Sequence, residues 1–274
     1  MDVVSPPMVE HPTRAAVDSA PPAIEWPRKH SLFGVDVSAT TYDEVVDVVI
    51  EAARAGVPAR VSALAVHGLM TGSEDRAFRE MLNAFEILTP DGQPVRFALN
   101  LLHGAGLSDR VYGPELMRRL CERGAREGVS VYLYGSYPHV VQALARNLVA
   151  RYPGLRVAGC EPSLFRPLTA AEDAALAARV NESGAGMLFV GLGCPRQETF
   201  AHEHRETIRP VQICVGAAFD FLAGNKTMAP RWMQQRGLEW LYRLMQEPRR
   251  LWRRYTSTNL RFVVKLCAGL VARR

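Results

Sequence analysis

The sequence is poor in the residues that build disulfide frameworks and metal clusters. Its five cysteines (Cys121, Cys160, Cys194, Cys214 and Cys267) are an odd number and form no Cys-x-x-Cys pair. This spacing argues against a disulfide scaffold and a structural zinc site, and it fits a reducing compartment best. The N-terminal residues also lack a basic segment followed by an apolar one, so we expect no secretory signal.

Two nucleotide-binding fingerprints are missing as well. The chain contains neither a complete Gly-x-Gly-x-x-Gly motif nor a Gly-x-x-x-x-Gly-Lys-[Ser/Thr] motif. Their absence counts against a dinucleotide-dependent oxidoreductase and against a P-loop. There is no Asp-x-Asp pair either. A diphosphate-binding enzyme with this sequence would therefore neutralise phosphate charge with arginine rather than with a bound divalent cation.

The chain does have a large apolar content and an uneven distribution of charge. With 274 residues, of which 48% are hydrophobic, it can bury a core for one large α/β unit or two small domains. From Lys226 onward it holds twelve Lys and Arg but only two acids, a net charge of +10. Because the whole chain carries +5, the preceding 225 residues carry −5. A basic C-terminal segment on an acidic body implies an anionic partner.

The sequence pattern divides the chain into three parts. Residues 1–30 are rich in proline and predict a disordered tail, whereas residues 226–274 form the basic helical appendage. Between them, residues 31–225 alternate β-rich apolar runs with amphipathic helical patterns. This alternation predicts an α/β, Rossmann-like parallel sheet flanked by helices on both faces. A junction near residues 122–128 divides this core into two lobes, which could share one sheet.

The expected elements follow from hydrophobic periodicity and from turn and cap residues. We expect strands over residues 31–38, 59–66, 86–90, 129–135, 155–160, 186–193 and 211–221, and helices over residues 42–56, 74–85, 93–102, 114–126, 138–152, 169–183 and 196–208. Thr41 and Glu44 have the spacing of a capping box at the first helix. In open parallel sheets, ligands bind where strands end and helices begin. The motifs "LTPDGQPV", "YLYGSYPHV" and "GLGCPRQE" lie at such ends.

Asp91 lies at the crest of the first of these turns, between Pro90 and Gly92. It could serve only as a helix cap or Asx-turn residue, because Pro, Asp and Gly each favour a turn. It could instead act as a general base, since partial burial raises the pKa of a carboxyl group and lets it accept a proton from a hydroxyl group.

The other two turns place glycine between a strand and a helix. Backbone N–H groups and a helix N-terminus can then face an anion, although a tight turn needs glycine for steric reasons alone. Gln197 and Glu198 fall in the first helical turn after "GLGCP", where they could bind ribose or sugar hydroxyls. His67 either contacts a ligand or fills the edge of the core. His202 and His204 point to different sides of a helix, and we expect them on a solvated face.

The C-terminal segment predicts a basic amphipathic helix after Pro248. On a helical wheel one stripe holds Arg250, Arg254, Arg261 and Lys265, and the opposite face holds Trp252, Tyr255, Phe262, Leu266 and Leu270. Such a helix is a candidate for lying in a membrane interface, but its apolar run is too short to span a bilayer. The alternative is a helix that packs on the core with an ordinary solvated face. We expect no nucleic-acid partner, because the aromatic residues do not alternate with the arginines.

Several motifs resemble those of the WecG/TagA/CpsF glycosyltransferases, glycosyltransferase family 26. They are "TPDGQPV", "RVYGPELM", "LYGSYPHVV", "FVGLGCPRQE", "VGAAFDFLAG" and the long "APRWMQQRGLEWLYRLMQEPRRLWRRY". The resemblance covers most of the chain. It implies an inverting, metal-independent transferase without a cofactor. The enzyme would move a sugar from a UDP-sugar to a saccharide on a polyprenyl diphosphate at the cytoplasmic membrane face, in exopolysaccharide or cell-envelope glycan synthesis.

The resemblance also implies roles for individual residues. Asp91 matches the catalytic aspartate, which would accept the proton of the acceptor hydroxyl. Gln197 matches a glutamine near the donor or acceptor, and Arg243, Arg250 and Arg254 match a basic appendage that stabilises the leaving diphosphate and touches the membrane. We further expect substrate contacts from the neighbouring turns. These residues are His67, Thr89, Gly92, Gly135, Gly191, Gly193, Pro195 and Glu198.

One position departs from the family pattern. Many members carry an asparagine after the second strand, where this chain has Ala65, so that polar contact is absent or His67 substitutes for it. Donors in the family include N-acetylmannosamine, its uronic acid and glucose; a glucose donor fits the loss of asparagine. A membrane-docked, non-catalytic scaffold is the alternative, with Asp91 only as a cap. The apolar face of the tail could also serve a second copy of the chain in place of anionic lipid.

Overall fold

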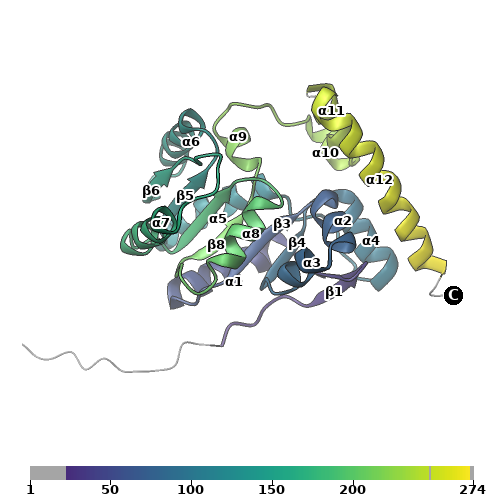
Figure 1. Ribbon diagram of the computed structural model, residues 1–274, viewed down its shortest axis with the longest axis horizontal. Coiled ribbons are helices and arrows are strands. Elements are labelled where there is room, and N and C mark those ends of the chain that lie inside the picture. Colours follow the sequence, from purple (N-terminus) through teal and green to yellow (C-terminus); the bar gives the residue numbers. More distant parts are fainter. Residues whose placement is uncertain (1–22, 247, 272–274) are drawn as a thin grey trace, which may run out of the picture.

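The computed structural model describes residues 23–246 and 248–271, so most of the predicted N-terminal tail lies outside them. At the centre is one six-stranded parallel sheet in the order β4-β3-β8-β7-β5-β6 (Figure 1). The strands are β3 (Arg60–Leu64), β4 (Ile87–Pro90), β5 (Val131–Gly135), β6 (Val157–Glu161), β7 (Met187–Gly191) and β8 (Val211–Cys214). The predicted α/β, Rossmann-like architecture is confirmed, and both predicted lobes contribute strands to the single sheet.

The helices in chain order are α1 (Tyr42–Ala55), α2 (Val66–Glu74), α3 (Arg76–Asn83), α4 (Gln93–His103), α5 (Gly113–Glu127), α6 (Pro138–Arg151), α7 (Ala170–Glu182), α8 (Arg196–Glu203), α9 (Ala218–Leu222), α10 (Arg231–Gln235), α11 (Glu239–Gln246) and α12 (Pro248–Val271). The predicted capping box is present at α1. Thr41 Oγ1 accepts from the Glu44 N–H at 3.3 Å, and the Glu44 carboxylate accepts from the Thr41 N–H.

The N-terminal prediction was wrong in two respects. Residues 31–38 are not one strand but lie within an antiparallel hairpin, β1 (Lys29–Leu32) and β2 (Val35–Ser38). Phe33 and Gly34 make its turn with positive φ angles of 55° and 90°, which breaks the extended run. The tail also ends earlier than residue 30, because Ile24 and Trp26 already pack on the core.

Two helices of the core, α2 and α9, were missed, and α10 of the appendage was not predicted as a separate helix. The predicted helix over residues 74–85 is α3, and α2 precedes it without a strong sequence signal because it contains Gly68 and Gly72. These glycines let α2 pack closely, since a Cβ on Gly72 would lie 2.8 Å from the Leu82 side chain. Likewise, the strand predicted over residues 211–221 ends at Cys214, and α9 follows a turn at Gly216, where φ is 51°.

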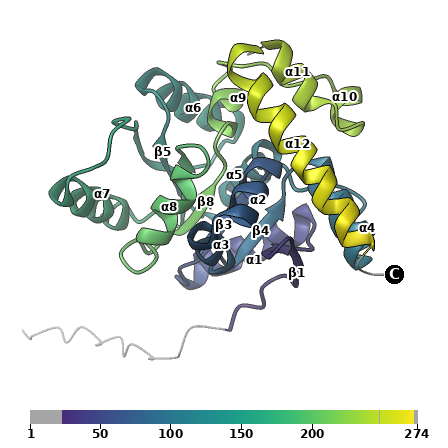
Figure 2. The same ribbon diagram turned by 45° about the vertical axis from the view of Figure 1, so that its right-hand side comes forward.

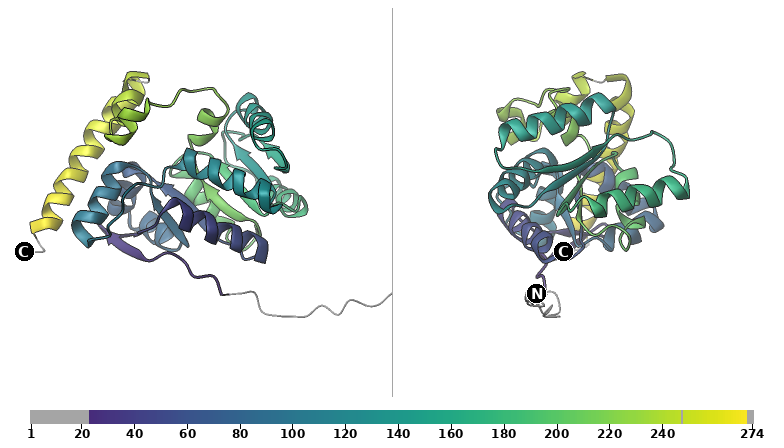
Figure 3. Two further views of the ribbon diagram at one scale, coloured as in Figure 1. Left: turned by 180° about the vertical axis from the view of Figure 1, so that it is seen from behind. Right: turned by 90° about the vertical axis from the view of Figure 1, so that its left-hand side faces the viewer.

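Alternate strand residues build two cores, one on each face of the sheet. Val131 and Leu133 face the core shared with α1, α5 and α6, which cover this face when the molecule is seen from behind (Figure 3). Tyr132 and Tyr134 face the other core, together with residues of α2, α3, α4, α7 and α8. Burial on both faces explains why the strands are almost continuously apolar.

The C-terminal helix α12 lies across the second layer of helices. It runs beside α2 and α4 (Figures 1 and 2) and follows α11 at the top of the molecule. Phe262 is buried and stacks edge-on against Phe33 of the hairpin turn, and Leu266 is half-buried. These residues are therefore core contacts.

The basic stripe predicted for this helix is not wholly exposed to solvent. Arg261 pairs with Glu74 of α2 at 2.5 Å, and the Lys265 ammonium approaches the Ser73 carbonyl at 3.4 Å. The outward face of α12 instead carries exposed apolar side chains, those of Leu260, Val264, Leu270 and Val271. Within residues 23–246 and 248–271, no helix is long and apolar enough to cross a membrane.

Candidate active site

The turn after β4 presents Asp91 at the carboxyl edge of the sheet. Gly92, whose φ of 116° favours glycine, turns the chain away from the strand so that α4 begins at residue 93. Thr89 is fully buried; its hydroxyl donates to the Val111 carbonyl at 3.1 Å and its carbonyl accepts from the Asp91 N–H at 2.8 Å. Thr89 therefore holds the turn and does not reach the site directly, contrary to its predicted substrate contact.

The Asp91 carboxylate is not the cap of α4. Gly92 is the N-cap residue of that helix, and Asp91 Oδ2 accepts from the Gly113 N–H at the start of α5, at 3.3 Å. Burial raises the pKa of Asp91 to about 6, in opposition to Arg110 and Arg243, whose positive charges lower it. At neutral pH this carboxylate is ionised but poorly solvated, as suits a general base.

Arg110 forms an ion pair with Glu239 next to Asp91. The two side chains are only 7% and 15% exposed, and the guanidinium carbon of Arg110 lies 4.4 Å from the centre of the Tyr112 ring. Glu239 is the first residue of α11, so this pair fastens the appendage to the core. The nearby negative charge of Glu239 raises the pKa of Asp91, whereas Arg110 lowers it.

A cavity of about 370 Å³ opens beside Asp91, between the sheet edge and the appendage. Its lining comes from the N-termini of α2 and α4, from the segment before α5 and from α11 and α12. The residues are Ala65, Val66, His67, Asp91, Gly92, Gln93, Pro94, Arg110, Tyr112, Gly237, Glu239, Trp240, Arg243, Thr258, Asn259, Phe262 and Val263. A larger cavity of about 660 Å³ adjoins it and shares Gln93, Arg110 and Tyr112 with it.

The turn after β7 lies farther along the same sheet edge. Gln197 Oε1 accepts from the Gly193 N–H at 3.2 Å, and its amide nitrogen donates to Glu198 at 2.9 Å. Glu198 also accepts from the Ser62 hydroxyl at 2.9 Å and is almost completely buried, which raises its pKa. The Gln197 and Glu198 side chains thus stabilise the turn through hydrogen bonds inside the protein.

The glycines at the ends of β5 and β7 and in the turn after β7 have two kinds of surroundings. A Cβ on Gly135 would lie 2.6 Å from the Gly191 backbone, and a Cβ on Gly191 would lie 2.7 Å from the Phe219 ring, so close packing explains both glycines. Gly193, with a φ of 79°, has open space around a built Cβ. Pro195 lines a separate cavity of about 490 Å³ next to α7 and α8.

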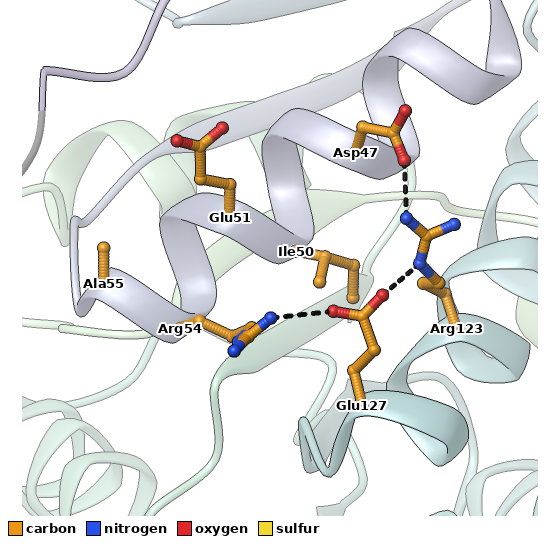
Figure 4. A pocket seen from close by; sticks show the side chains of 7 residues that line it. All are labelled: Asp47, Ile50, Glu51, Arg54, Ala55, Arg123 and Glu127. Carbon is orange, nitrogen blue, oxygen red and sulfur yellow. Dashed lines mark hydrogen bonds and ion pairs between the residues drawn. The ribbon is translucent and has the colours of Figure 1, made fainter.

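A further groove, between α1 and α5, holds charged residues but lies elsewhere (Figure 4). Arg123 binds Asp47 at 2.8 Å, Arg54 binds Glu127 at 3.2 Å, and Arg123 also pairs with Glu127. Arg54, Arg123 and Glu127 belong to the C-terminal halves of the two helices, which lie toward the edge of the sheet opposite Asp91. The charged groups neutralise one another and join the helices, so this groove is not the candidate site.

Comparison with known proteins assigns the chain to a family. Residues 30–274 match the Glycosyl transferase WecG/TagA/CpsF family. The chain belongs to this family. It is 30% identical over 185 residues to the N-acetylglucosaminyldiphosphoundecaprenol N-acetyl-beta-D-mannosaminyltransferase of Bacillus subtilis (strain 168), which covers 67% of this chain and 70% of the relative. A relative with the same name from Bacillus spizizenii (strain ATCC 23059 / NRRL B-14472 / W23) is 30% identical over 181 residues, 66% of this chain and 68% of the relative. The prediction of a glycosyltransferase is confirmed.

In this glycosyltransferase, part of the predicted set of site residues lies together. His67, Asp91, Gly92 and Arg243 line the cavity beside Asp91. The side chains of Arg250 and Arg254 lie outside those that the structure describes. Their predicted contacts with substrate and membrane remain predictions.

Sequence reasoning gave no role to several residues that line the glycosyltransferase cavity, among them Gln93, Arg110, Tyr112 and Glu239. Arg110 and Tyr112 belong to the motif "RVYGPELM", which carried the family resemblance but no role. Glu239 is one of only two acids in the basic segment. A rare acid among twelve cations was the signal that could have indicated an ion pair with a core residue such as Arg110.

The prediction for His204 was wrong. This histidine is buried, its Nδ1 lies 2.8 Å from the Phe200 carbonyl, and its Nε2 lies 3.0 Å from Asp173. It is the C-cap residue of α8 and stacks on the ring of Phe200, which belongs to the second core. In the part of the chain that the structure describes, no three His, Cys, Asp or Glu side chains group as a metal-ion site requires.

Proposed function

We propose that this protein transfers a hexose from a UDP-sugar to a saccharide linked to a polyprenyl diphosphate, with inversion at the anomeric carbon and without a metal ion. The named activity of the two Bacillus relatives, which use an N-acetylglucosaminyl diphosphoundecaprenol acceptor, supports the substrate class. The observation that carries the catalytic part is Asp91, a carboxylate with a pKa raised to about 6 on the wall of a cavity.

The proposed chemistry needs one proton transfer and one displacement. Asp91 accepts the proton of the acceptor hydroxyl as its oxygen attacks the anomeric carbon. The bond from that carbon to the UDP oxygen breaks on the opposite face, and UDP leaves with the electron pair. The charges of Arg110 and Arg243 lie on the same cavity and stabilise the diphosphate that departs.

The donor sugar is proposed among glucose, N-acetylmannosamine and its uronic acid. Ala65 lines the cavity where many family members place asparagine, so its methyl group gives no polar contact to an acetamido group. His67, two residues further along the chain, lines the same cavity and is the polar side chain nearest in sequence. This arrangement favours glucose as the donor.

We also propose that the protein acts on the inner face of the plasma membrane as a peripheral protein, in cell-envelope or exopolysaccharide glycan synthesis. The outward face of α12 carries exposed Leu260, Val264 and Val271, and α4, which α12 contacts, carries exposed Phe97 and Leu101. Apolar side chains of this kind, next to a basic segment, favour a lipid interface. A polyprenyl-linked acceptor would meet the cavity at this surface.

The test is UDP release from UDP-glucose, UDP-N-acetylmannosamine and its uronic acid. Each donor is offered with and without a short polyprenyl-diphosphate-linked N-acetylglucosamine, in liposomes that contain anionic lipid. We expect one donor to give acceptor-dependent UDP release that Asp91→Asn abolishes. Acceptor-dependent turnover that persists in Asp91→Asn would refute Asp91 as the base. If none of the pairs turns over, the proposed substrate class is wrong and the scaffold alternative gains support.

A further inference from the structure

Gln93 lies where the two neighbouring cavities meet. It is the first residue of α4, two positions after Asp91, and the residue is only 6% exposed. It nevertheless lines both the 370 Å³ cavity beside Asp91 and the adjoining 660 Å³ cavity. The side chain thus forms part of the wall between the two cavities, and its amide oxygen is shielded from bulk water.

The hydrogen bonds of this amide are incomplete. Gln93 Nε2 reaches Asp109 Oδ1 only at 3.5 Å, the outer limit of a hydrogen bond, and Oε1 accepts from no donor among the described residues. Gly237 of the appendage covers the side chain, since a Cβ on Gly237 would lie 3.2 Å from Gln93 Cβ. A buried carbonyl oxygen without a donor is costly, so the free protein keeps an unsatisfied acceptor in the wall of the two cavities.

We propose that Gln93 Oε1 accepts a hydrogen bond from a hydroxyl or acetamido N–H of the sugar next to Asp91, and that Gln93 is a specificity-determining residue of the transferase. The proposal rests on the function proposed above and adds a recognition contact to it. The same chemistry can come from the transferred sugar or from the acceptor sugar. A site built to pair with such a group discriminates strongly against a sugar that lacks it.

The test compares Gln93→Met with wild type in the full-length protein. Methionine has a similar length and volume but offers no oxygen acceptor. We expect kcat/KM for UDP release to fall about 10- to 100-fold, while the melting temperature stays equal or rises because the unpaired acceptor is gone. A residue with only a structural role would lower the melting temperature together with activity. Gln93→Leu serves as a second apolar variant if Gln93→Met does not fold.

Gln212 provides a matched control. It is also buried, and its Oε1 also has no hydrogen-bond partner among the described residues, but it lies near the start of β8, at the opposite edge of the sheet. Its amide nitrogen donates to the His204 carbonyl at 3.3 Å and to the Ala201 carbonyl at 3.5 Å. Gln212→Met therefore should lower stability and leave kcat/KM unchanged, the reverse of Gln93→Met.

Calorimetric titration with UDP, UDP-glucose and UDP-N-acetylmannosamine identifies the source of the donor group. If it belongs to the transferred sugar, Gln93→Met weakens binding of a UDP-sugar but not of UDP; if it belongs to the acceptor, only the acceptor KM rises. An active wild type whose kcat/KM and acceptor KM are unchanged within twofold by Gln93→Met would overturn the proposal. If the wild type turns over no donor and acceptor pair, the proposed function fails, and the titration alone then tests the role of Gln93. In that case, equal binding of the UDP-sugars by wild type and Gln93→Met would overturn the proposal for Gln93.

Discussion

Replacement of Asp91 by asparagine should remove activity and at the same time stabilise the protein. Asparagine keeps the shape of the side chain but has no basic oxygen, so the acceptor hydroxyl loses its proton acceptor. Loss of a positioned general base lowers the rate by about 10²- to 10⁴-fold. The stabilisation has a separate cause, because at neutral pH the folded protein holds an ionised carboxylate that burial disfavours.

The size and sign of the stabilisation follow from the pKa of Asp91. Folding raises it from 3.8 to about 6, so the folded state binds the proton more tightly than the unfolded state. The free energy of unfolding that this group contributes is therefore intact below pH 3.8 and is lost as the pH rises through about 6. The loss amounts to about 1.5 kcal/mol at pH 5 and about 3 kcal/mol at pH 8. Asp91→Asn should recover these amounts.

The measurement combines urea unfolding of wild type and Asp91→Asn at pH 5 to 8 with UDP release over the same range. For wild type, kcat/KM should rise with pH through about 6 as Asp91 ionises. Asp75→Asn is the matched control, since Asp75 caps α3 through the Phe78 N–H and asparagine caps equally well. A stability gain for Asp91→Asn that does not grow with pH would refute the reasoning, as would retained activity.

Further predictions concern the charges around Asp91 and the surface of α12. Glu239→Gln should move the acid limb of the pH–rate profile to lower pH, because the negative charge of Glu239 raises the Asp91 pKa. Arg110→Met should move the limb to higher pH, and urea unfolding should show a loss of about 3–5 kcal/mol because a buried carboxylate stays unpaired. Val264→Glu should weaken co-sedimentation with anionic liposomes, whereas Val149→Glu, at a similarly exposed position on α6, should not. Equal binding by both valine variants would contradict a lipid role for α12.

The sheet and most helices could be predicted from the sequence because their signals are local. Apolar strand runs, the Thr41 capping box and the Pro-Asp-Gly turn each depend on a few adjacent residues. The α2 helix could not be predicted in this way. Its glycines disfavour a helix in isolation, and Gly72 is explained by its packing against the side chains of Leu82 in α3 and Val35 in β2, which only the fold brings together.

The candidate site was predictable only in part, for a related reason. Asp91 was found because its turn is a contiguous motif. Arg110 and Glu239 are 129 residues apart, and only the fold brings the basic segment's acid onto a core arginine. Counting charges therefore indicated the positive charge of the appendage correctly. It could not show that Arg261 and Lys265 contact the last turn of α2.

The unfavourable features of the molecule that concern function gather in one place. A poorly solvated carboxylate, a buried amide oxygen without a donor and a guanidinium paired with an appendage carboxylate all line the same cavity. The carboxylate and the amide oxygen each cost stability in the free protein, and the bound substrates could relieve both costs, because a sugar hydroxyl or acetamido N–H can donate to Gln93 and the acceptor hydroxyl gives its proton to Asp91. A local loss of folding stability is expected at a site where the binding energy of the substrate is used for catalysis. Because Glu239 lies on α11, substrate that competes for Arg110 would also loosen the contact that holds the appendage over the site.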